Sequence, residues 1–311
     1  MSKRIAFLFA GQGAQEVGMG KDLAGRYSAA AELFQRADAL LDRPLSQIAF
    51  EGPAEELTKT IHCQPALFVH GLACLAALRQ EVGEITAVAA AGLSLGEFTA
   101  HASAGTFSFD TGLSLVAQRA AFMQEACDAT VGAMAAMIGG EVADVRQLAA
   151  EADVDVANIN APGQIVISGE EAKIATAIGI AKNFNIRRAT KLEVAGAYHS
   201  RLMESAYRKL GEVLDRTELR TPDFTVISNI DAQPVTDAAS IRNALREQVT
   251  GSVLWADSLV RLIDEEKIDL FIEFGPKGVL AGLLNRTRKG TPILSISDVP
   301  SLEAAVAALK A

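Results

Sequence analysis

The sequence predicts an α/β fold in which a mostly parallel sheet carries a smaller α+β subdomain as an insertion. Two observations support this prediction. Over most of the chain, apolar runs of five or six residues, the length of one buried strand, alternate with longer segments of helical spacing. Between residues 132 and 194 this alternation changes to a different order of strands and helices. A chain of 311 residues is long enough for both parts and for a sizeable core.

The larger part is predicted from apolar runs that are joined by helical segments. Parallel strands need crossover connections, so this pattern favours a mostly parallel sheet with helices on both faces. The helix predicted at 64–78 is apolar nearly all round, which indicates a buried position. The predicted strands are 5–9, 86–91, 224–229, 270–274 and 292–296, and the helices predicted before residue 130 include 22–41, 64–78 and 110–127.

The inserted part follows the order β-α-β-β-α-β, which is typical of a ferredoxin-like unit. We therefore expect a core formed by residues 1–130 and 197–311 and a small subdomain formed by residues 131–196. The strands predicted in the insertion are 133–138, 154–159, 164–168 and 189–194, and its predicted helices are 141–152 and 170–183.

Composition narrows the class of protein. Hydrophobic residues make up 50% and charged residues 22%, which is typical of a soluble globular protein. A net charge of -9 argues against a nucleic-acid-binding protein. No apolar run reaches the ~20 residues of a membrane span, and the first four residues lead directly into a strand without a signal peptide. Cys63, Cys74 and Cys127 form no C-x-x-C pair, so we expect reduced thiols and a cytoplasmic location.

The segment Gly92–Gly96 carries the strongest sign of chemistry. It has the form G-x-S-x-G, with a predicted strand before it and a predicted helix after it. In this context Ser94 lies on a sharp turn that exposes its hydroxyl, and the free N–H of Leu95 at the helix start is able to help hold an oxyanion. An ordinary tight turn is the alternative interpretation.

A glycine-rich loop follows the first predicted strand. Glu16 stands where a dinucleotide-binding G-x-G-x-x-G would have its third glycine, so that interpretation is poor. The loop can still bring the N–H of Gln12 to the end of the sheet where Ser94 also emerges. A simple strand-to-helix turn is the alternative.

His199 is the remaining candidate base for Ser94, because it lies where the chain returns from the insertion. His62 and His70 are each expected to be structural histidines, not catalytic ones. His101 lies two helical turns after Ser94 and is expected to point elsewhere. On helix geometry Arg119 is either a surface side chain or a buried guanidinium that grips a carboxylate, and its spacing does not choose between them.

Together these signals closely resemble the malonyl-CoA:acyl carrier protein transacylases of fatty acid synthesis, from one end of the chain to the other. The resemblance depends on motifs in the right order. They are 9–15 (FAGQGAQ), 64–67 (QPAL), 92–98 (GLSLGEF), Arg119, 160–164 (NAPGQ), 196–200 (GAYHS), 228–234 (SNIDAQP) and 275–276 (GP).

The resemblance implies a hydrolase-like core, a ferredoxin-like insertion and an active site in the cleft between them. It makes Ser94 the nucleophile, His199 the base and Arg119 the anchor of the malonyl carboxylate. The N–H groups of Gln12 and Leu95 would form the oxyanion hole. The remaining residues implied to bind substrate are Gln64, Asn160 and Asn229.

The resemblance also implies a malonyl-enzyme intermediate and ping-pong kinetics, with malonyl-CoA as donor and the phosphopantetheine thiol of an acyl carrier protein as acceptor. It implies a monomer without metal or cofactor of its own, since the phosphopantetheine belongs to the partner. Carrier proteins are acidic, so we expect a local basic docking patch. The candidates are Arg187, Arg188 and Lys191 at the end of the insertion, and Arg201, Arg208 and Lys209 after His199.

Three positions depart from the common pattern of this family. Leu93 replaces a histidine before the serine. Leu254 stands before the tryptophan in place of Gln or Arg, and its main-chain carbonyl remains able to orient His199. Tyr198 replaces Phe before His199, and its bulk is expected to narrow the acyl pocket and to favour malonyl over methylmalonyl.

Three other functions remain open from the sequence. One is an acyltransferase that serves a polyketide synthase in trans. Another is a serine esterase in which Asp153 or Asp155 completes the triad, although the HGGG-type loop is missing. A non-catalytic binding protein is the third, and the joint presence of Ser94, His199 and Arg119 disfavours it.

Overall fold

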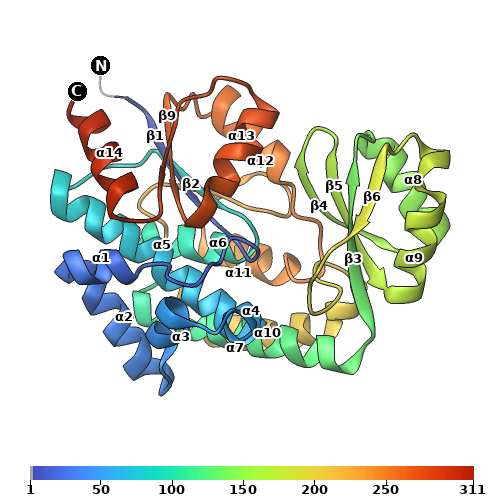
Figure 1. The fold of residues 1–311 in the computed structure, drawn as a ribbon, viewed down its shortest axis with the longest axis horizontal. Coiled ribbons are helices and arrows are strands. Elements are labelled where there is room, and N and C mark those ends of the chain that lie inside the picture. The colour runs from blue at the N-terminus through green and yellow to red at the C-terminus, as the bar shows by residue number, and fades with distance from the viewer. Residues whose placement is uncertain (1–2) are drawn as a thin grey trace.

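The computed structural model describes residues 3–311 and contains two sheets (Figure 1). The strands of the larger sheet are β1 (Ile5–Phe9), β2 (Ala89–Gly92), β7 (Thr225–Ile227), β8 (Pro234–Val235), β9 (Leu270–Phe274) and β10 (Ile293–Ile296). Their order is β10-β9-β1-β2-β7-β8, and every pair is parallel except β7 with β8. The predicted mostly parallel sheet is confirmed.

Strand β1 lies at the centre of this sheet and is buried on both faces. Phe7 and Phe9 pack on one face with Phe274 of β9, at ring-centroid distances of 5.3 Å for both pairs. Ala6 and Leu8 point to the other face and join a second apolar cluster. A strand without a polar face needs helices on both sides, which is why the sheet is covered twice.

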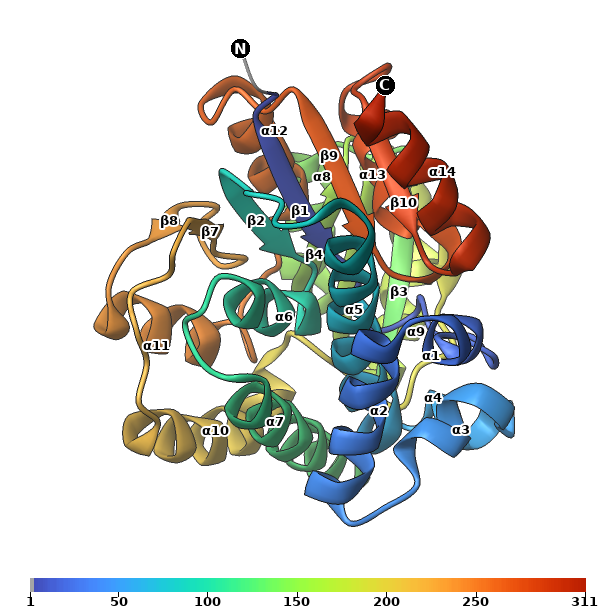
Figure 2. The ribbon, with the colours of Figure 1, turned by 90° about the vertical axis from the view of Figure 1, so that its left-hand side faces the viewer.

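The helices divide between the two faces (Figures 1 and 2). One face is covered by α12 (Trp255–Asp264) and α13 (Val279–Thr287). The helices of the other side and its surroundings are α1 (Lys21–Arg26), α2 (Ser28–Leu41), α3 (Leu45–Glu51), α4 (Ala54–Thr58), α5 (Thr60–Val82), α6 (Leu95–Ser103), α7 (Phe109–Ala129), α10 (Glu204–Arg216), α11 (Ala238–Glu247) and α14 (Val299–Lys310).

Two predicted helices differ from the observed ones. The segment 22–41 is split into α1 and α2, because Tyr27 takes an extended conformation (φ -120°, ψ 118°) with a buried side chain. Helix α5 begins at Thr60, before Pro65. Proline has no N–H for the carbonyl of Ile61, and a guanidinium N–H of Arg43 donates to that carbonyl at 2.8 Å instead.

From the sequence we expect no segment apolar enough to span a membrane, and helix α5 is an exception by length and composition. Its length and composition would suffice to cross a bilayer, but 83% of its most apolar window is buried inside the protein. A helix that is apolar all round belongs either to a membrane or to the centre of a large core. Here it is a core helix, as its predicted burial indicates.

The second sheet is antiparallel and has the order β4-β5-β3-β6. This is the strand order of a ferredoxin-like unit, and it agrees with the predicted fold class. The two helices of the insertion, α8 and α9, pack on one face of this sheet. The limits of the subdomain, 131–196, stay a prediction. The elements are β3 (Gly132–Ile138), α8 (Val142–Ala152), β4 (Asp155–Ala161), β5 (Gln164–Glu170), α9 (Glu171–Ile180), a 3-10 turn (Ala181–Phe184) and β6 (Arg188–Lys191).

Main-chain hydrogen bonds join the small sheet to the core. The N–H of Ile159 in β4 donates to the carbonyl of Val253 at 2.9 Å, and the N–H of Val253 donates to Ala157 at 2.8 Å. Arg201 adds a bidentate ion pair with Asp155 at the start of β4. These contacts hold β4 of the insertion against two segments of the core, one at Arg201 and one at Val253.

Candidate active site

The turn between β2 and α6 has the geometry of a nucleophile elbow. Ser94 has φ 54° and ψ -108°, a conformation that costs energy for a residue with a Cβ and is found at strained functional turns. A Cβ on Gly92 would lie 1.9 Å from the carbonyl of Gly96, and one on Gly96 would lie 2.1 Å from the carbonyl oxygen of Phe9. Only glycine therefore lets strand and helix pass this closely.

Ser94 is hydrogen-bonded to His199, as a nucleophile is to its base. Its Oγ lies 2.8 Å from Nε2 of the histidine. Nδ1 of His199 lies 2.7 Å from the main-chain carbonyl of Gln248, so Nδ1 carries the proton and Nε2 has a free lone pair. Burial, and then the charge of Arg119, lower the pKa of His199 to about 4. The imidazole is therefore neutral at pH 7 and is able to accept the serine proton.

The carbonyl that orients His199 belongs to Gln248, which corrects the expectation for Leu254. The N–H of Leu254 donates to Asn229 at 2.8 Å, and its carbonyl accepts from Ser258 inside α12. Gln248 caps the C-terminus of α11, where the last carbonyls of a helix have no partner within the helix. That position explains how a main-chain oxygen is free to face a histidine, and no local sequence pattern marks it.

Arg119 is buried, so of the two alternatives for its helix position the surface side chain is wrong. Its side chain extends from α7, is 1% exposed and lies 5.5 Å from the ring of Phe98. One terminal nitrogen donates to Oε1 of Gln64 at 2.6 Å. The other donates to Oε1 of Gln248 at 2.9 Å and to Oγ of Ser94 at 3.0 Å.

These hydrogen-bond partners of Arg119 are neutral, and the buried carboxyl of Glu97 acts on it through charge without being one of them. Burial lowers the pKa of Arg119 to about 10, which leaves it protonated at pH 7. Its Nε has no hydrogen-bond partner within residues 3–311. A desolvated guanidinium with spare donors favours an incoming carboxylate.

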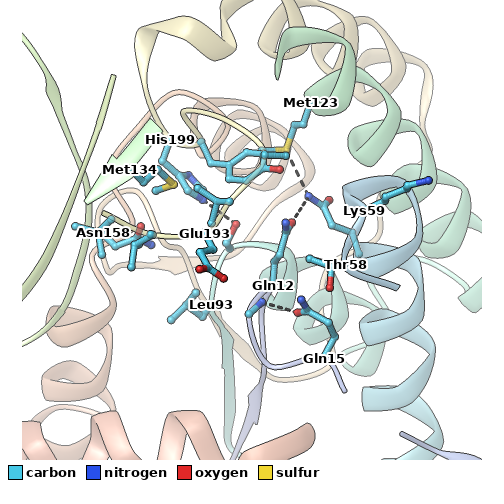
Figure 3. Close-up of a pocket in the computed structure, with 18 of the residues that line it drawn as sticks. Gln12, Gln15, Thr58, Lys59, Leu93, Met123, Met134, Asn158, Glu193 and His199 are labelled. Atoms are coloured by element: carbon cyan, nitrogen blue, oxygen red, sulfur yellow. Dashed lines mark hydrogen bonds between the residues drawn. The ribbon is translucent and has the colours of Figure 1, made fainter. Parts of the chain in front are cut away.

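A cavity of about 600 Å³ opens over Ser94 and is lined from both parts of the protein (Figure 3). Gln12 and Gln64 line it on the core side, where Nε2 of Gln64 donates to Oε1 of Gln12 at 3.3 Å. Asn160 lines it from β4, and its Oδ1 has no hydrogen-bond partner within residues 3–311. The predicted polar residues of the loop, of α5 and of the insertion thus meet at one cavity.

Two other predicted residues lie under or beside the turn. Leu95 is the first residue of α6 and is 1% exposed, so its N–H belongs to the unpaired first turn of the helix. Asn229 is fully buried, with Nδ2 donating to Gly92 at 2.8 Å and Oδ1 accepting from the N–H of Ser94 at 2.7 Å. This corrects its expected contact with substrate, because its amide is used to hold the elbow.

Tyr198 also lines the cavity, and its hydroxyl lies 2.5 Å from Oγ1 of Thr60. The Tyr198 ring is fixed by the main chain at one end and by the contact of its hydroxyl with Thr60 at the other, so it has little freedom to move away and widen the pocket. The preference for an unbranched acyl group stays a prediction. Thr60 opens α5 and was not predicted to contribute.

The residues proposed for an esterase triad lie elsewhere. Asp153 and Asp155 both pair with Arg201, and Asp153 also pairs with Lys173. The carbonyl of Gln248 already occupies the side of His199 that a triad acid would need. The geometry therefore disfavours the esterase interpretation.

The other histidines make structural contacts, as expected. His70 bonds to the carbonyl of Ser297 at 3.0 Å, and His101 bonds to Thr106 at 3.0 Å. His62 lies 3.7 Å from Glu56 and is partly buried.

Comparison with known proteins agrees with this geometry. The acyl transferase domain family matches residues 6–308. The malonyl CoA-acyl carrier protein transacylase of Bacillus subtilis is 42% identical over the whole of this chain and 98% of its own length. An acyl-carrier-protein S-malonyltransferase from Burkholderia pseudomallei superposes with a TM-score of 0.93 at 37% identity, over 98% of this chain and 99% of that one.

A further solved structure is a malonyl-transacylase in complex with a type II PKS acyl-carrier protein. It superposes with a TM-score of 0.93 at 34% identity and covers 98% of this chain and 99% of its own. A nucleophile elbow and a histidine base line one cavity, and a buried arginine is hydrogen-bonded to the nucleophile beneath it. With relatives that match over nearly their full length, the chain belongs to the malonyl-CoA:acyl carrier protein transacylases of the acyl transferase family.

Proposed function

We propose that this enzyme transfers the malonyl group of malonyl-CoA to the phosphopantetheine thiol of an acyl carrier protein, through an ester on Ser94. One observation carries the proposal. The Ser94 hydroxyl is hydrogen-bonded both to a neutral histidine, at 2.8 Å, and to a buried arginine whose hydrogen-bond partners are all neutral, at 3.0 Å. A base activates the hydroxyl, and a cation beside it suits an acyl group that ends in a carboxylate.

In the first half-reaction Ser94 Oγ attacks the thioester carbonyl of malonyl-CoA while Nε2 of His199 takes its proton. The N–H groups of Leu95 and Gln12 are proposed to stabilise the oxyanion of the tetrahedral intermediate. When the intermediate collapses, the carbon–sulfur bond breaks and the imidazolium returns the proton to the coenzyme A thiolate. A malonyl ester of Ser94 remains.

In the second half-reaction the phosphopantetheine thiol of the carrier protein gives its proton to Nε2 of His199 and attacks the ester carbonyl. Collapse of this intermediate breaks the bond to Ser94 Oγ, which takes the proton back. The carbonyl of Gln248 accepts from Nδ1 throughout, so the ring keeps Nε2 toward the serine. Donor and acceptor use the same site in turn, which predicts ping-pong kinetics.

Arg119 is proposed to select malonyl over acetyl. Gln64 and Gln248 hold two of its donor nitrogens in place, so little order is lost when a carboxylate arrives. A bound acetyl group would leave the buried guanidinium without a carboxylate hydrogen-bonded to it. Asn160 and Gln64 both line the cavity, and we propose that they contact the rest of the acyl group or the pantetheine arm.

The carrier protein as acceptor is supported by the related transacylase that was solved with a type II PKS acyl-carrier protein. Fatty acid synthesis is the proposed setting, and rates with the two kinds of carrier protein would distinguish it from polyketide synthesis. We further propose a cytoplasmic monomer without a cofactor of its own, where its three free, buried cysteines stay reduced.

The test is intact-protein mass spectrometry after mixing with malonyl-CoA or acetyl-CoA, followed by holo carrier protein. Wild type is expected to gain a malonyl adduct that disappears when carrier protein is added and reappears on it. Ser94→Ala should gain no adduct, and Arg119→Ala should lose the preference for malonyl. An adduct that is lost to water and never reaches the carrier would favour a hydrolase instead.

A further inference from the structure

Glu97 is a buried carboxylate beside the catalytic residues that the mechanism above does not use. It lies in the first turn of α6, three residues after Ser94, and is fully buried. Its Oε2 accepts from Nε2 of Gln248 at 2.5 Å and from the N–H of Asn229 at 3.2 Å. Its Oε1 has no hydrogen-bond partner within residues 3–311. Burying a carboxylate costs folding free energy, so a buried carboxylate at this position is expected to serve the site.

We propose that Glu97 is a positioning residue that sets the orientation of the Gln248 amide and, through it, the direction of the Arg119 guanidinium. The inference rests on the proposed function, because it assigns the residue that prepares Arg119 for the malonyl carboxylate.

The donors and acceptors around the Gln248 amide fix its orientation. Its nitrogen faces two acceptors, the carboxylate of Glu97 at 2.5 Å and the carbonyl of Ser94 at 3.0 Å. The carbonyl of Ser94 only accepts, and Oε2 of Glu97 accepts beside it, so the NH₂ end points toward both. The amide oxygen is then left to face Arg119, which only donates.

A reversed amide would place its NH₂ group against the guanidinium and its oxygen against Glu97 and Ser94. Both contacts would be repulsive, and Arg119 would lose one of its two amide anchors. Removing Glu97 takes away one of the two acceptors that oppose this reversal. The remaining anchor from Gln64, at 2.6 Å, holds the other terminal nitrogen alone.

Glu97 and Arg119 also act on each other through their charges. The other ionisable groups facing this cluster are His199, whose pKa is lowered by burial, and Asp231, whose charge acts on Glu97. Hydrogen bonding and charge therefore both connect Glu97 to the anchor, and the test has to separate them.

Glu97→Gln and Glu97→Ala separate the two contributions. In Glu97→Gln the amide oxygen is able to accept from both Gln248 and Asn229, so the ratio of malonyl to acetyl acylation should stay within about twofold of wild type. In Glu97→Ala the ratio should fall by about 10- to 100-fold, the loss expected for a hydrogen bond to a charged group. Most of that fall should appear as a raised KM for malonyl-CoA, because Arg119 grips the carboxylate before and during the reaction.

Glu273→Ala is the matched control. Glu273 is also fully buried, but it accepts from the N–H groups of Leu280 and Ala281 at the start of α13 and from Ser295. Its loss should lower stability and leave the malonyl to acetyl ratio unchanged. An unchanged ratio in Glu97→Ala, or an equal loss of kcat with both acyl-CoAs, would overturn the proposal.

Gln248→Ala tests the route of the effect. If Glu97 acts through the Gln248 amide, the double variant should discriminate no worse than Gln248→Ala alone. Losses that multiply in the double variant would show that Glu97 acts by another route. If Glu97→Ala does not fold, Glu97→Asp carries the same test, since its shorter side chain withdraws the acceptor, and an unchanged ratio there would also overturn the proposal.

A readout independent of transfer keeps this inference separate from the proposed function. The side-chain NH₂ signals of Gln248 in NMR spectra should exchange slowly with solvent in wild type and faster in Glu97→Ala. If wild type gives no malonyl adduct, the proposed function fails, and the exchange rates alone decide on the role of Glu97. Equal exchange rates in the two proteins would overturn that role.

Discussion

Nδ1 of His199 donates its proton to the main-chain carbonyl of Gln248 over 2.7 Å, in the place where a serine-histidine-acid triad has a carboxylate. A carbonyl fixes the tautomer and the direction of the ring as a carboxylate does. It brings no full negative charge to stabilise the imidazolium, while burial and then the positive charge of Arg119 disfavour it. The pair is thus a base that stays neutral over a wide range of pH.

The first prediction concerns the pH dependence of acylation. Burial and the charge of Arg119 lower the pKa of His199 to about 4, so the neutral form that accepts the serine proton dominates above that value. The rate of coenzyme A release in the first turnover should change little between pH 7 and 5 and fall as the pH passes through about 4. A fall centred near 6.5, the ordinary value for histidine, would contradict it. Circular dichroism at each pH checks that the protein is folded.

The second prediction concerns the glycines of the elbow. A Cβ on Gly96 would lie 2.1 Å from the main-chain oxygen of Phe9, and neither backbone is able to move cheaply. Gly96→Ala should therefore lower the free energy of unfolding by at least about 2 kcal/mol and abolish the malonyl adduct.

Gly179→Ala is the control for this change. It lies inside α9 and its Cβ would meet no atom within 4 Å, so it should raise stability by about 0.5–1 kcal/mol with normal activity. Urea unfolding and the mass of the acyl-enzyme measure both effects. Equal stability of the two variants would show that the close approach at the elbow is not needed.

The third prediction concerns stability in acid. Burial lowers the pKa of His70 and His199 to about 4 and that of His101 to about 3, from 6.5 in the unfolded chain. Between pH 6.5 and about 4 the unfolded state therefore binds more protons, and the free energy of unfolding falls as the pH falls. Each histidine contributes about 1 kcal/mol per pH unit.

Glu97 and Glu273 act in the opposite direction, because burial raises the pKa of both carboxyl groups, that of Glu97 to about 7, and the folded state then binds these protons first. The three histidines outnumber these two carboxyl groups, so urea unfolding at pH 7 and pH 5 should give a clearly lower free energy at pH 5. His101→Gln should reduce the dependence on pH. The same free energy at both pH values would show that these histidines are not buried in the neutral form.

The fourth prediction concerns the docking of the carrier protein. Four of the six basic residues proposed from the sequence have a local acidic partner: Lys191 with Glu171, Arg201 with Asp153 and Asp155, Arg208 with Glu204, and Lys209 with Glu125. Arg187 and Arg188 have no carboxylate within 4.0 Å among residues 3–311; Arg188 donates to Thr190. These two are the stronger candidates for meeting an acidic partner.

Arg187→Glu with Arg188→Glu should raise KM for the carrier protein several-fold, with a larger effect at low salt, and leave acylation by malonyl-CoA unchanged. Arg208→Glu serves as the control, because its charge already faces Glu204. No change in KM at low salt would remove Arg187 and Arg188 from the docking surface.

Local pattern was enough to predict much of the fold. Strand β1 was predicted with its observed limits, and so was β9, because each is a short apolar run buried on both faces. The elbow was predicted because a turn this tight requires glycines two residues before and after Ser94, and the sequence shows that spacing directly. Element ends that depend on capping were less accurate, as at Tyr27, where an extended residue divides one predicted helix into two.

By itself the sequence determined the α/β class, the inserted ferredoxin-like unit and the candidate pair Ser94 and His199, since each follows from local spacing and order. Only the tertiary structure decided that Arg119 is buried beside the nucleophile, that Asn229 holds the elbow and that Gln248, not Leu254, orients the histidine. Residues far apart in the chain make these contacts, and a main-chain carbonyl or a buried side-chain amide leaves no mark on the local pattern. Folding brings them together because most buried polar groups need a hydrogen-bond partner.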